Sequence, residues 1–239
     1  MPTMRYEGVE IRYEEHGRGF PVLLFAPGGM RSAIRYWEKA PFNPIDALAP
    51  QFRVIAMDQR NAGRSRAPVT PRDGWYSYTR DHLALLDHLD IGGCHLLGSC
   101  IGGPYCLGLM QAAPGRVASA VLQQSIGLEG NRQAFYRMFD GWAQELKAAR
   151  GDLDDATLRA FRSNLYDGEF VFSVSRDFVR GCGIPMLVLM GNDLHHPAAI
   201  SREIAALAPR AELVEQWKEP EHVTTTITRV TDFLRRQTP

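Results

Sequence analysis

The chain has 239 residues, of which 45% are hydrophobic, so it is long and apolar enough to bury a large core. It carries 27 Lys and Arg against 27 Asp and Glu, and this balance argues against nucleic acid or an anionic membrane as the main partner. No apolar run reaches the ~18 residues of a membrane span, and the first residues lack the pattern of a signal peptide. We therefore expect a cytoplasmic protein with no nucleic-acid or membrane partner; the sequence leaves a homodimer open.

Short apolar segments alternate with amphipathic ones along the chain, which is typical of a mostly parallel sheet with helices on both faces. Residues 4–17 alternate in polarity and contain a glycine, so we expect a leading β-hairpin there. The later strands are expected within residues 21–29, 52–58, 94–100, 117–124, 185–193 and 211–219. Helices are expected within residues 77–90, 102–114, 196–209 and 223–237. Because no repeat or linker interrupts this alternation, residues 1–239 are predicted to form one α/β domain.

Residues 128–180 break the alternation of strands and helices. Within 131–150, apolar and aromatic side chains recur at helical spacing, and 154–170 repeats that pattern after an aspartate suited to capping a helix. Helices inserted between two strands are predicted to form a small cap over the site. We expect most of its aromatic residues to pack the cap onto the body, with one or two lining a pocket.

The stretch HLLGSCIGGPY, residues 95–105, has the form of a nucleophile elbow, a tight strand-to-helix turn written G-x-Nu-x-G. The positions two before and two after the nucleophile must be small, because the strand and the helix approach each other closely there. Taking Cys100 as the nucleophile places Gly98 and Gly102 at those positions. Taking Ser99 would place bulky residues there. The spacing therefore selects Cys100, whose position at a helix N-terminus favours the thiolate.

Four motifs together resemble the α/β-hydrolase fold superfamily over nearly the whole chain. They are the elbow, DQRNAGRS at residues 58–65, GNDLHHP at residues 191–197, and EPEHVTTTITRVTDFL at residues 219–234. The resemblance implies the α/β-hydrolase fold: a mostly parallel central sheet, helices on both faces and a small helical cap. It also implies the order nucleophile, acid, histidine along the chain.

The resemblance implies a catalytic triad of Cys100, Asp193 and His222. Asp193 is the only carboxylate just after the strand within 185–193, and its spacing to Pro197 matches the acid loop of the superfamily. His222 is the only histidine that follows the last expected strand. Asp193 would orient the imidazole, and His222 would keep Cys100 as the thiolate.

The histidine pair next to Asp193 is not assigned to the triad. His195 and His196 are consecutive, and consecutive side chains seldom point the same way. No further ligands cluster with them, so we expect no metal site. The chemistry of the triad also needs no cofactor, and none is expected.

The oxyanion hole is expected to use two backbone N–H groups. One belongs to Ile101, directly after the nucleophile. The other is expected from the loop after residues 21–25, where the superfamily usually has His-Gly and this chain has Ala26-Pro27-Gly28-Gly29-Met30. Gly29 is favoured as the donor, with Met30 as the alternative.

A largely apolar pocket is expected, with four substrate-binding candidates: Met30, Tyr105, Phe139 and Trp142. The direct interpretation is a hydrolase that cleaves a small ester, thioester or lactone through an acyl intermediate on Cys100. The superfamily includes dienelactone hydrolases, which use Cys, Asp and His, although the other motifs here look more like single-domain hydrolases with a small cap. Two alternatives remain open: an acyltransferase that uses the same acyl-cysteine, and a ligand-binding protein without catalysis on a hydrolase scaffold.

Overall fold

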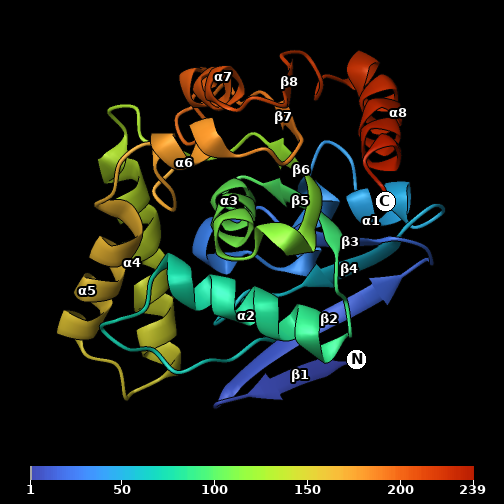
Figure 1. The fold of residues 1–239 in the computed structure, drawn as a ribbon. Helices are drawn as coiled ribbons and strands as arrows, with labels where there is room; N and C mark the ends of the chain where they lie inside the picture. The colour runs from blue at the N-terminus through green and yellow to red at the C-terminus, as the bar shows by residue number, and fades with distance from the viewer. Residues whose placement is uncertain (1) are drawn as a thin grey trace.

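The computed structural model describes residues 2–239, and its centre is one eight-stranded sheet in the order β1-β2-β4-β3-β5-β6-β7-β8 (Figure 1). The strands β1, β2 and β4 pair antiparallel in succession, and the pairs from β4 onward are parallel. The strands are β1 (Thr3–Tyr6), β2 (Val9–His16), β3 (Pro21–Phe25), β4 (Arg53–Met57), β5 (Cys94–Ser99), β6 (Val117–Gln123), β7 (Met186–Leu189) and β8 (Ala211–Val214). The expected α/β-hydrolase fold class is confirmed.

Helices cover both faces of the sheet (Figure 1). The α-helices are α1 (Pro44–Leu48), α2 (Trp75–His88), α3 (Gly102–Ala112), α4 (Arg132–Ala149), α5 (Asp155–Tyr166), α6 (Arg176–Gly181), α7 (Ala198–Leu207) and α8 (Pro220–Arg236). Short 3-10 helices are η1 (Gly29–Arg31), η2 (Ile34–Lys39) and η3 (Pro114–Arg116). One face packs against α2, α3 and α7, and the other packs against α1 and α8.

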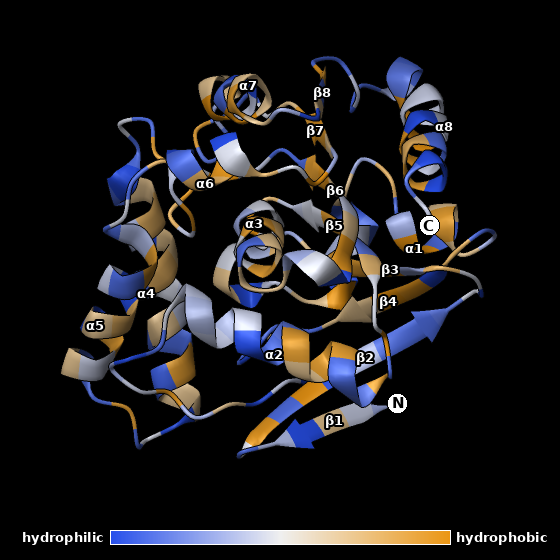
Figure 2. Cartoon of the chain, in the orientation of Figure 1, coloured by the Kyte–Doolittle hydropathy of each residue, from blue (hydrophilic) through white to orange (hydrophobic). Residues whose placement is uncertain are grey.

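Strand β3 shows why the central strands are apolar at every position. Leu23 and Phe25 belong to the core on the α3 side, whereas Val22 and Leu24 belong to the core on the α8 side. A strand covered on both faces buries every side chain, so it loses the alternation of a half-exposed strand. Figure 2 shows the same contrast, with orange strands at the centre of the sheet and mixed colours along α8.

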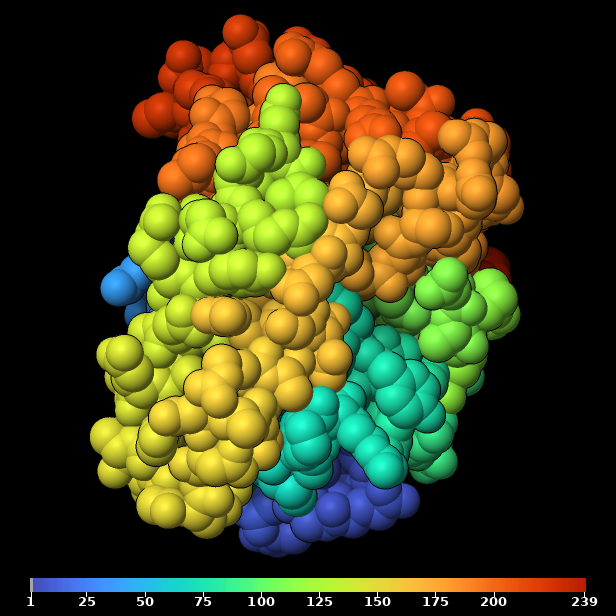
Figure 3. All heavy atoms as spheres, turned by 90° about the vertical axis from the view of Figure 1, so that its left-hand side faces the viewer, coloured from blue at the N-terminus to red at the C-terminus, as the bar shows by residue number. Residues whose placement is uncertain are grey.

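The segment between β6 and β7, where a cap is expected, contains α4, α5 and α6. Helices α4 and α5 pack against each other through aromatic edges: Phe161 lies 5.4 Å from Phe139 and 6.0 Å from Trp142, ring centre to ring centre. This segment forms much of the surface in Figure 3, coloured yellow-green to orange. Its helix α4 also contacts η1, which lies at the carboxyl end of β3. The insertion therefore reaches the edge of the sheet where the strands deliver polar residues.

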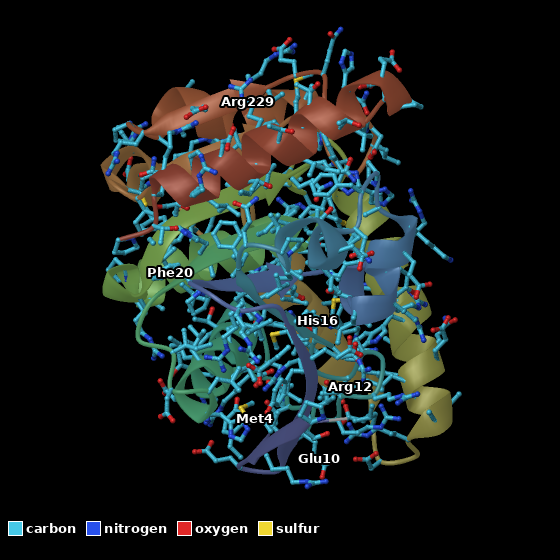
Figure 4. The ribbon with its side chains drawn as sticks, turned by 90° about the vertical axis from the view of Figure 1, so that its right-hand side faces the viewer. Met4, Glu10, Arg12, His16, Phe20 and Arg229 are labelled. Atoms are coloured by element: carbon cyan, nitrogen blue, oxygen red, sulfur yellow. The ribbon has the colours of Figure 1, made fainter. Side chains whose placement is uncertain are left out.

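The opposite side of the molecule is shown in Figure 4, where Arg12 and His16 lie along β2 and Arg229 lies on α8. Arg12 is buried against the carboxylate of Asp58, at 3.7 Å, whereas Arg229 reaches Glu212 at the surface. Within residues 2–239, no helix combines the length and the apolar character that crossing a membrane requires.

Candidate active site

The turn between β5 and α3 holds Cys100 in a left-handed backbone conformation, with φ at 60°. A non-glycine residue occupies this region only at a cost in free energy, which its surroundings must offset. Close packing at the turn also explains why positions 98 and 102 are glycines. A Cβ on Gly98 would lie 2.1 Å from the carbonyl oxygen of Gly102, and one on Gly102 would lie 2.4 Å from the carbonyl oxygen of Phe25. The chain therefore has the geometry that a nucleophile elbow requires.

The elbow exposes Cys100 and buries Ser99. Cys100 is partly exposed and lines a cavity, whereas Ser99 is the last residue of β5 and is fully buried. The Ser99 hydroxyl has no hydrogen-bond partner among the described residues. Only the thiol can meet a substrate from this turn.

The acid loop after β7 brings Asp193 and His196 together. The His196 Nδ1 atom lies 2.8 Å from each carboxylate oxygen of Asp193. The loop turns back because Asp193 Oδ1 also accepts hydrogen bonds from the backbone N–H groups of His195 and His196, at 2.9 and 3.1 Å. This is the local turn that aspartate side chains favour. The imidazole is thereby fixed by a carboxylate three residues earlier.

The other side of the His196 ring faces Cys100. Its Nε2 atom is buried and has no hydrogen-bond partner among the described residues. Burial opposes ionisation of the Cys100 thiol. The charge and contact of His196, together with the backbone N–H groups of Gly28 and Ile101, outweigh that effect and lower the pKa of Cys100. Burial also opposes the charge on His196, but Cys100 and then Asp193 raise its pKa to about 9. Opposite shifts of this kind favour a thiolate–imidazolium pair.

His222 does not take part in this array, which corrects the expected triad. It lies in the first turn of α8, half-buried, where its backbone N–H donates to the Glu219 carbonyl oxygen at 2.8 Å. It neither lines the cavity at Cys100 nor contributes to the pKa shift of the thiol. The position of imidazole beside the nucleophile belongs to His196, which the sequence interpretation set aside. The only signal for it was the Asp-x-x-His spacing within a short loop.

The backbone at residues 28–29 faces the nucleophile from the opposite loop. Gly28 and Gly29 have φ of 118° and 56°, a region that side chains with a Cβ rarely adopt. Both glycines line the cavity, together with Ile101. The N–H groups of Gly28 and Ile101 both help to lower the pKa of the Cys100 thiol. Two peptide amides from separate loops therefore lie near the place where charge would develop on an acyl oxygen.

The loop that carries these glycines is fixed by a buried polar network. The Ser32 hydroxyl donates to the Ala26 carbonyl oxygen at 2.6 Å, and Asp58 Oδ1 accepts from the Ile34 backbone N–H at 2.9 Å. Arg60, two residues after Asp58, donates to Asp81 and Asp73. The DQRNAGRS motif thus holds the loop between β3 and η2 in place and does not reach the cavity.

The cavity at Cys100 has a volume of about 200 Å³. It is lined by Gly28, Gly29, Cys100, Ile101, Ile126, Phe135, Met138, His195 and His196. None of the four expected substrate-binding residues lines it. Tyr105 is buried against Tyr78, with ring centres 4.8 Å apart, and Phe139 and Trp142 face α5. Met30 is buried below the loop, where its sulfur accepts a hydrogen bond from Tyr166.

The face of α4 explains this difference. Phe135 and Met138, one turn apart, point to the cavity. Phe139 and Trp142, also one turn apart, form the aromatic contact with α5. Helical spacing shows which residues share a face of α4, but it does not show which face lies toward Cys100.

The histidines and acids of the site do not form a metal centre among residues 2–239, where no group of three or more His, Cys, Asp or Glu side chains could hold an ion. His195 lines the cavity and packs edge-on against Phe135, at 5.6 Å between ring centres. Its pKa is lowered, chiefly by burial and then by the charge of His196.

Comparison with known proteins gives the family. The family model described as alpha/beta hydrolase fold matches residues 21–181. A Metapseudomonas resinovorans enzyme named 2-hydroxy-6-oxo-6-(2'-aminophenyl)hexa-2,4-dienoic acid hydrolase is 28% identical over an alignment of length 218, gaps included, and the match covers 78% of this chain and 72% of that protein. A protein of Azorhizobium caulinodans with the provisional name carbamate hydrolase RutD is 34% identical over 122 residues.

The second of these matches covers 51% of this chain and 43% of the relative, so the aligned part spans less than half of that protein. Among solved structures, the enol-lactonase from Burkholderia xenovorans LB400 superposes with a TM-score of 0.73 at 22% identity. That superposition covers 98% of this chain and 100% of the lactonase. At this identity the likeness concerns the fold alone.

Proposed function

Because this chain belongs to the α/β-hydrolase fold family, we propose that it is a hydrolase that cleaves a small ester, thioester or lactone through an acyl intermediate on Cys100. The observation that carries the proposal is the array of Cys100, His196 and Asp193, in which the pKa of the thiol is lowered and that of the imidazole is raised. A structural cysteine in a glycine-rich turn would have no need of such an array. The relatives named as hydrolases support the same reaction class.

In the first half of the reaction, the Cys100 thiolate attacks the acyl carbon, and a sulfur–carbon bond forms. The negative charge moves to the acyl oxygen, which the N–H groups of Ile101 and of Gly28 or Gly29 stabilise. The bond to the leaving group then breaks, and the His196 imidazolium gives its proton to the departing oxygen or sulfur. Asp193 holds the ring so that Nε2 faces the reacting atoms.

In the second half, water resolves the acyl-cysteine. Neutral His196 takes a proton from water, and the resulting hydroxide oxygen bonds to the acyl carbon. The sulfur–carbon bond breaks, which restores the thiolate beside the imidazolium and releases the acid. A thiolate leaves a tetrahedral intermediate readily, so attack on an amide would often revert. Esters, thioesters and lactones therefore suit this nucleophile better than amides.

Intact-mass spectrometry after brief exposure to phenyl acetate and S-phenyl thioacetate tests the proposal. Wild-type protein is expected to gain one acetyl group that water then removes, and Cys100→Ala is expected to gain none. Cys182→Ala is the matched control, because Cys182 lies away from the cavity and its variant keeps the nucleophile. Adding ethanol or a thiol separates acyl transfer from hydrolysis by its product. Absence of both adduct and turnover would leave ligand binding as the function of the site.

A further inference from the structure

The cavity at Cys100 is small and apolar, and its limiting wall comes from the cap. Its volume of about 200 Å³ lies below the ~300–1,000 Å³ of sites for drug-sized ligands. The reacting acyl carbon, its oxygen and the leaving atom must all lie within this volume. Little length remains for an acyl chain.

Met138 closes the cavity against the loop that carries the N–H donors. A Cβ on Gly29 would lie 2.1 Å from the Met138 sulfur, so the thioether rests directly on the backbone of Gly29. Met138 is only partly buried, and it is unbranched. The side chain can therefore be shortened without opening the core of the protein.

Phe135 forms the adjoining wall and is fixed in place. It is fully buried, stacks on Tyr166 with ring centres 5.5 Å apart, and meets Phe172 edge-on at 4.9 Å. Ile126, just after β6, completes the apolar side of the cavity. Because Phe135 is held in place and Met138 is flexible, Met138 is the residue that sets the depth of the cavity.

The lining also excludes a charged acyl chain. Among the cavity residues in the described chain there is no Lys, Arg, Asp or Glu, and the charge of His196 faces Cys100. A buried carboxylate or ammonium on the chain would have no partner and would lose its hydration. Cys100, Met138, His195 and His196 are each partly exposed, so the cavity opens to solvent on their side. A larger leaving group can extend through that opening.

We propose that the acyl group of the substrate is a short, uncharged chain of butanoyl length or less, and that Met138 sets this limit. The inference rests on the proposed function, because it concerns the acyl group that Cys100 receives. It places the specificity in α4 of the cap rather than in the triad.

A series of p-nitrophenyl esters from acetate to octanoate tests it, with kcat/KM measured for each chain length. Wild-type protein is expected to cleave acetate and butanoate at similar rates and to be at least about tenfold slower with octanoate, since even one misplaced methylene costs about tenfold or more. Met138→Ala is expected to raise the ratio of octanoate to butanoate by about tenfold. Leu146→Ala is the matched control: it shortens an apolar side chain on the same helix, away from the cavity, and keeps the wild-type ratio.

The outcomes separate the two proposals. If no ester acylates Cys100, the proposed function fails. If Cys100 is acylated but wild-type protein cleaves octanoate as fast as butanoate or faster, or Met138→Ala changes the ratio no more than Leu146→Ala, the limit on chain length is wrong while the hydrolase stands. Circular dichroism of each variant confirms that the compared proteins are folded.

Discussion

The Asp193 carboxylate holds the His196 ring by its Nδ1 atom, 2.8 Å from either oxygen, and the two residues stand only three positions apart in one loop. The acid and the base therefore share one turn after β7. The hydrogen bond places the proton on Nδ1 and turns Nε2 toward Cys100. In this arrangement the loop after β8 supplies neither the acid nor the imidazole.

Replacing each candidate histidine by glutamine distinguishes the two triads. His196→Gln is expected to lower kcat/KM for an aryl acetate at least ~1000-fold, because the base and the partner of the thiolate are both lost. His222→Gln is the control and is expected to stay within about twofold of wild type. A large loss in His222→Gln with little change in His196→Gln would restore the triad expected from the sequence.

The pH dependence follows from the two opposite pKa shifts. The thiolate forms above the lowered pKa of Cys100, so alkylation by iodoacetamide is expected to be fast already near neutral pH. The proton on His196 is lost as the pH rises through about 9, so ester cleavage is expected to decline above that pH. In His196→Gln, the alkylation profile is expected to move to higher pH. An unchanged profile would show that His196 does not act on the thiol.

Sequence reasoning predicted the elbow because the constraint there is local. Gly98 and Gly102 are required by contacts within one turn, and those contacts leave a visible pattern in the chain. The histidine could not be chosen in the same way. His195 and His196 differ in role because the loop turns on hydrogen bonds from their N–H groups to Asp193, which depend on the folded backbone.

The helices inserted between β6 and β7 show the same limit of sequence reasoning. The periodicity of residues 131–150 predicts an amphipathic helix, and α4 occupies Arg132–Ala149. Which of its apolar residues face the nucleophile depends on how the helix is rotated against η1 and α5. The contact of Met138 with Gly29 joins residues far apart in the sequence, so no spacing within the helix could indicate it.

The elbow glycine gives a prediction about stability. Gly98→Ala is expected to lower the free energy of unfolding by about 1–3 kcal/mol, because the added methyl would meet the Gly102 carbonyl oxygen at 2.1 Å. Displacement of the turn should also reduce esterase activity. Gly92→Ala is the control, since its added Cβ meets no atom within 4 Å, and its effect should stay within about 0.5 kcal/mol. Urea unfolding measures both, and equal effects would show that the elbow relaxes around the methyl.

The buried side chain of Arg60 gives the last prediction. Arg60 donates to Asp81 at 2.7 and 3.0 Å and to Asp73 at 2.8 Å, and the Asp81 side chain is fully buried. Removing one partner of a buried pair leaves the other charge without compensation, so Arg60→Met is expected to cost about 3–5 kcal/mol in unfolding free energy.

Arg180→Met provides the comparison, because Arg180 and Asp177 form an ion pair whose side chains are 58% and 89% exposed. Water screens that pair, so its loss should cost no more than about 1 kcal/mol. Arg60→Met should also lower the ester-cleavage rate, since Arg60 lies in the motif whose Asp58 holds the Ile34 backbone and thereby the Gly28–Gly29 loop. If both variants lose a comparable amount of unfolding free energy, other groups must compensate the carboxylates around Arg60. The buried network would then not be what holds the oxyanion loop.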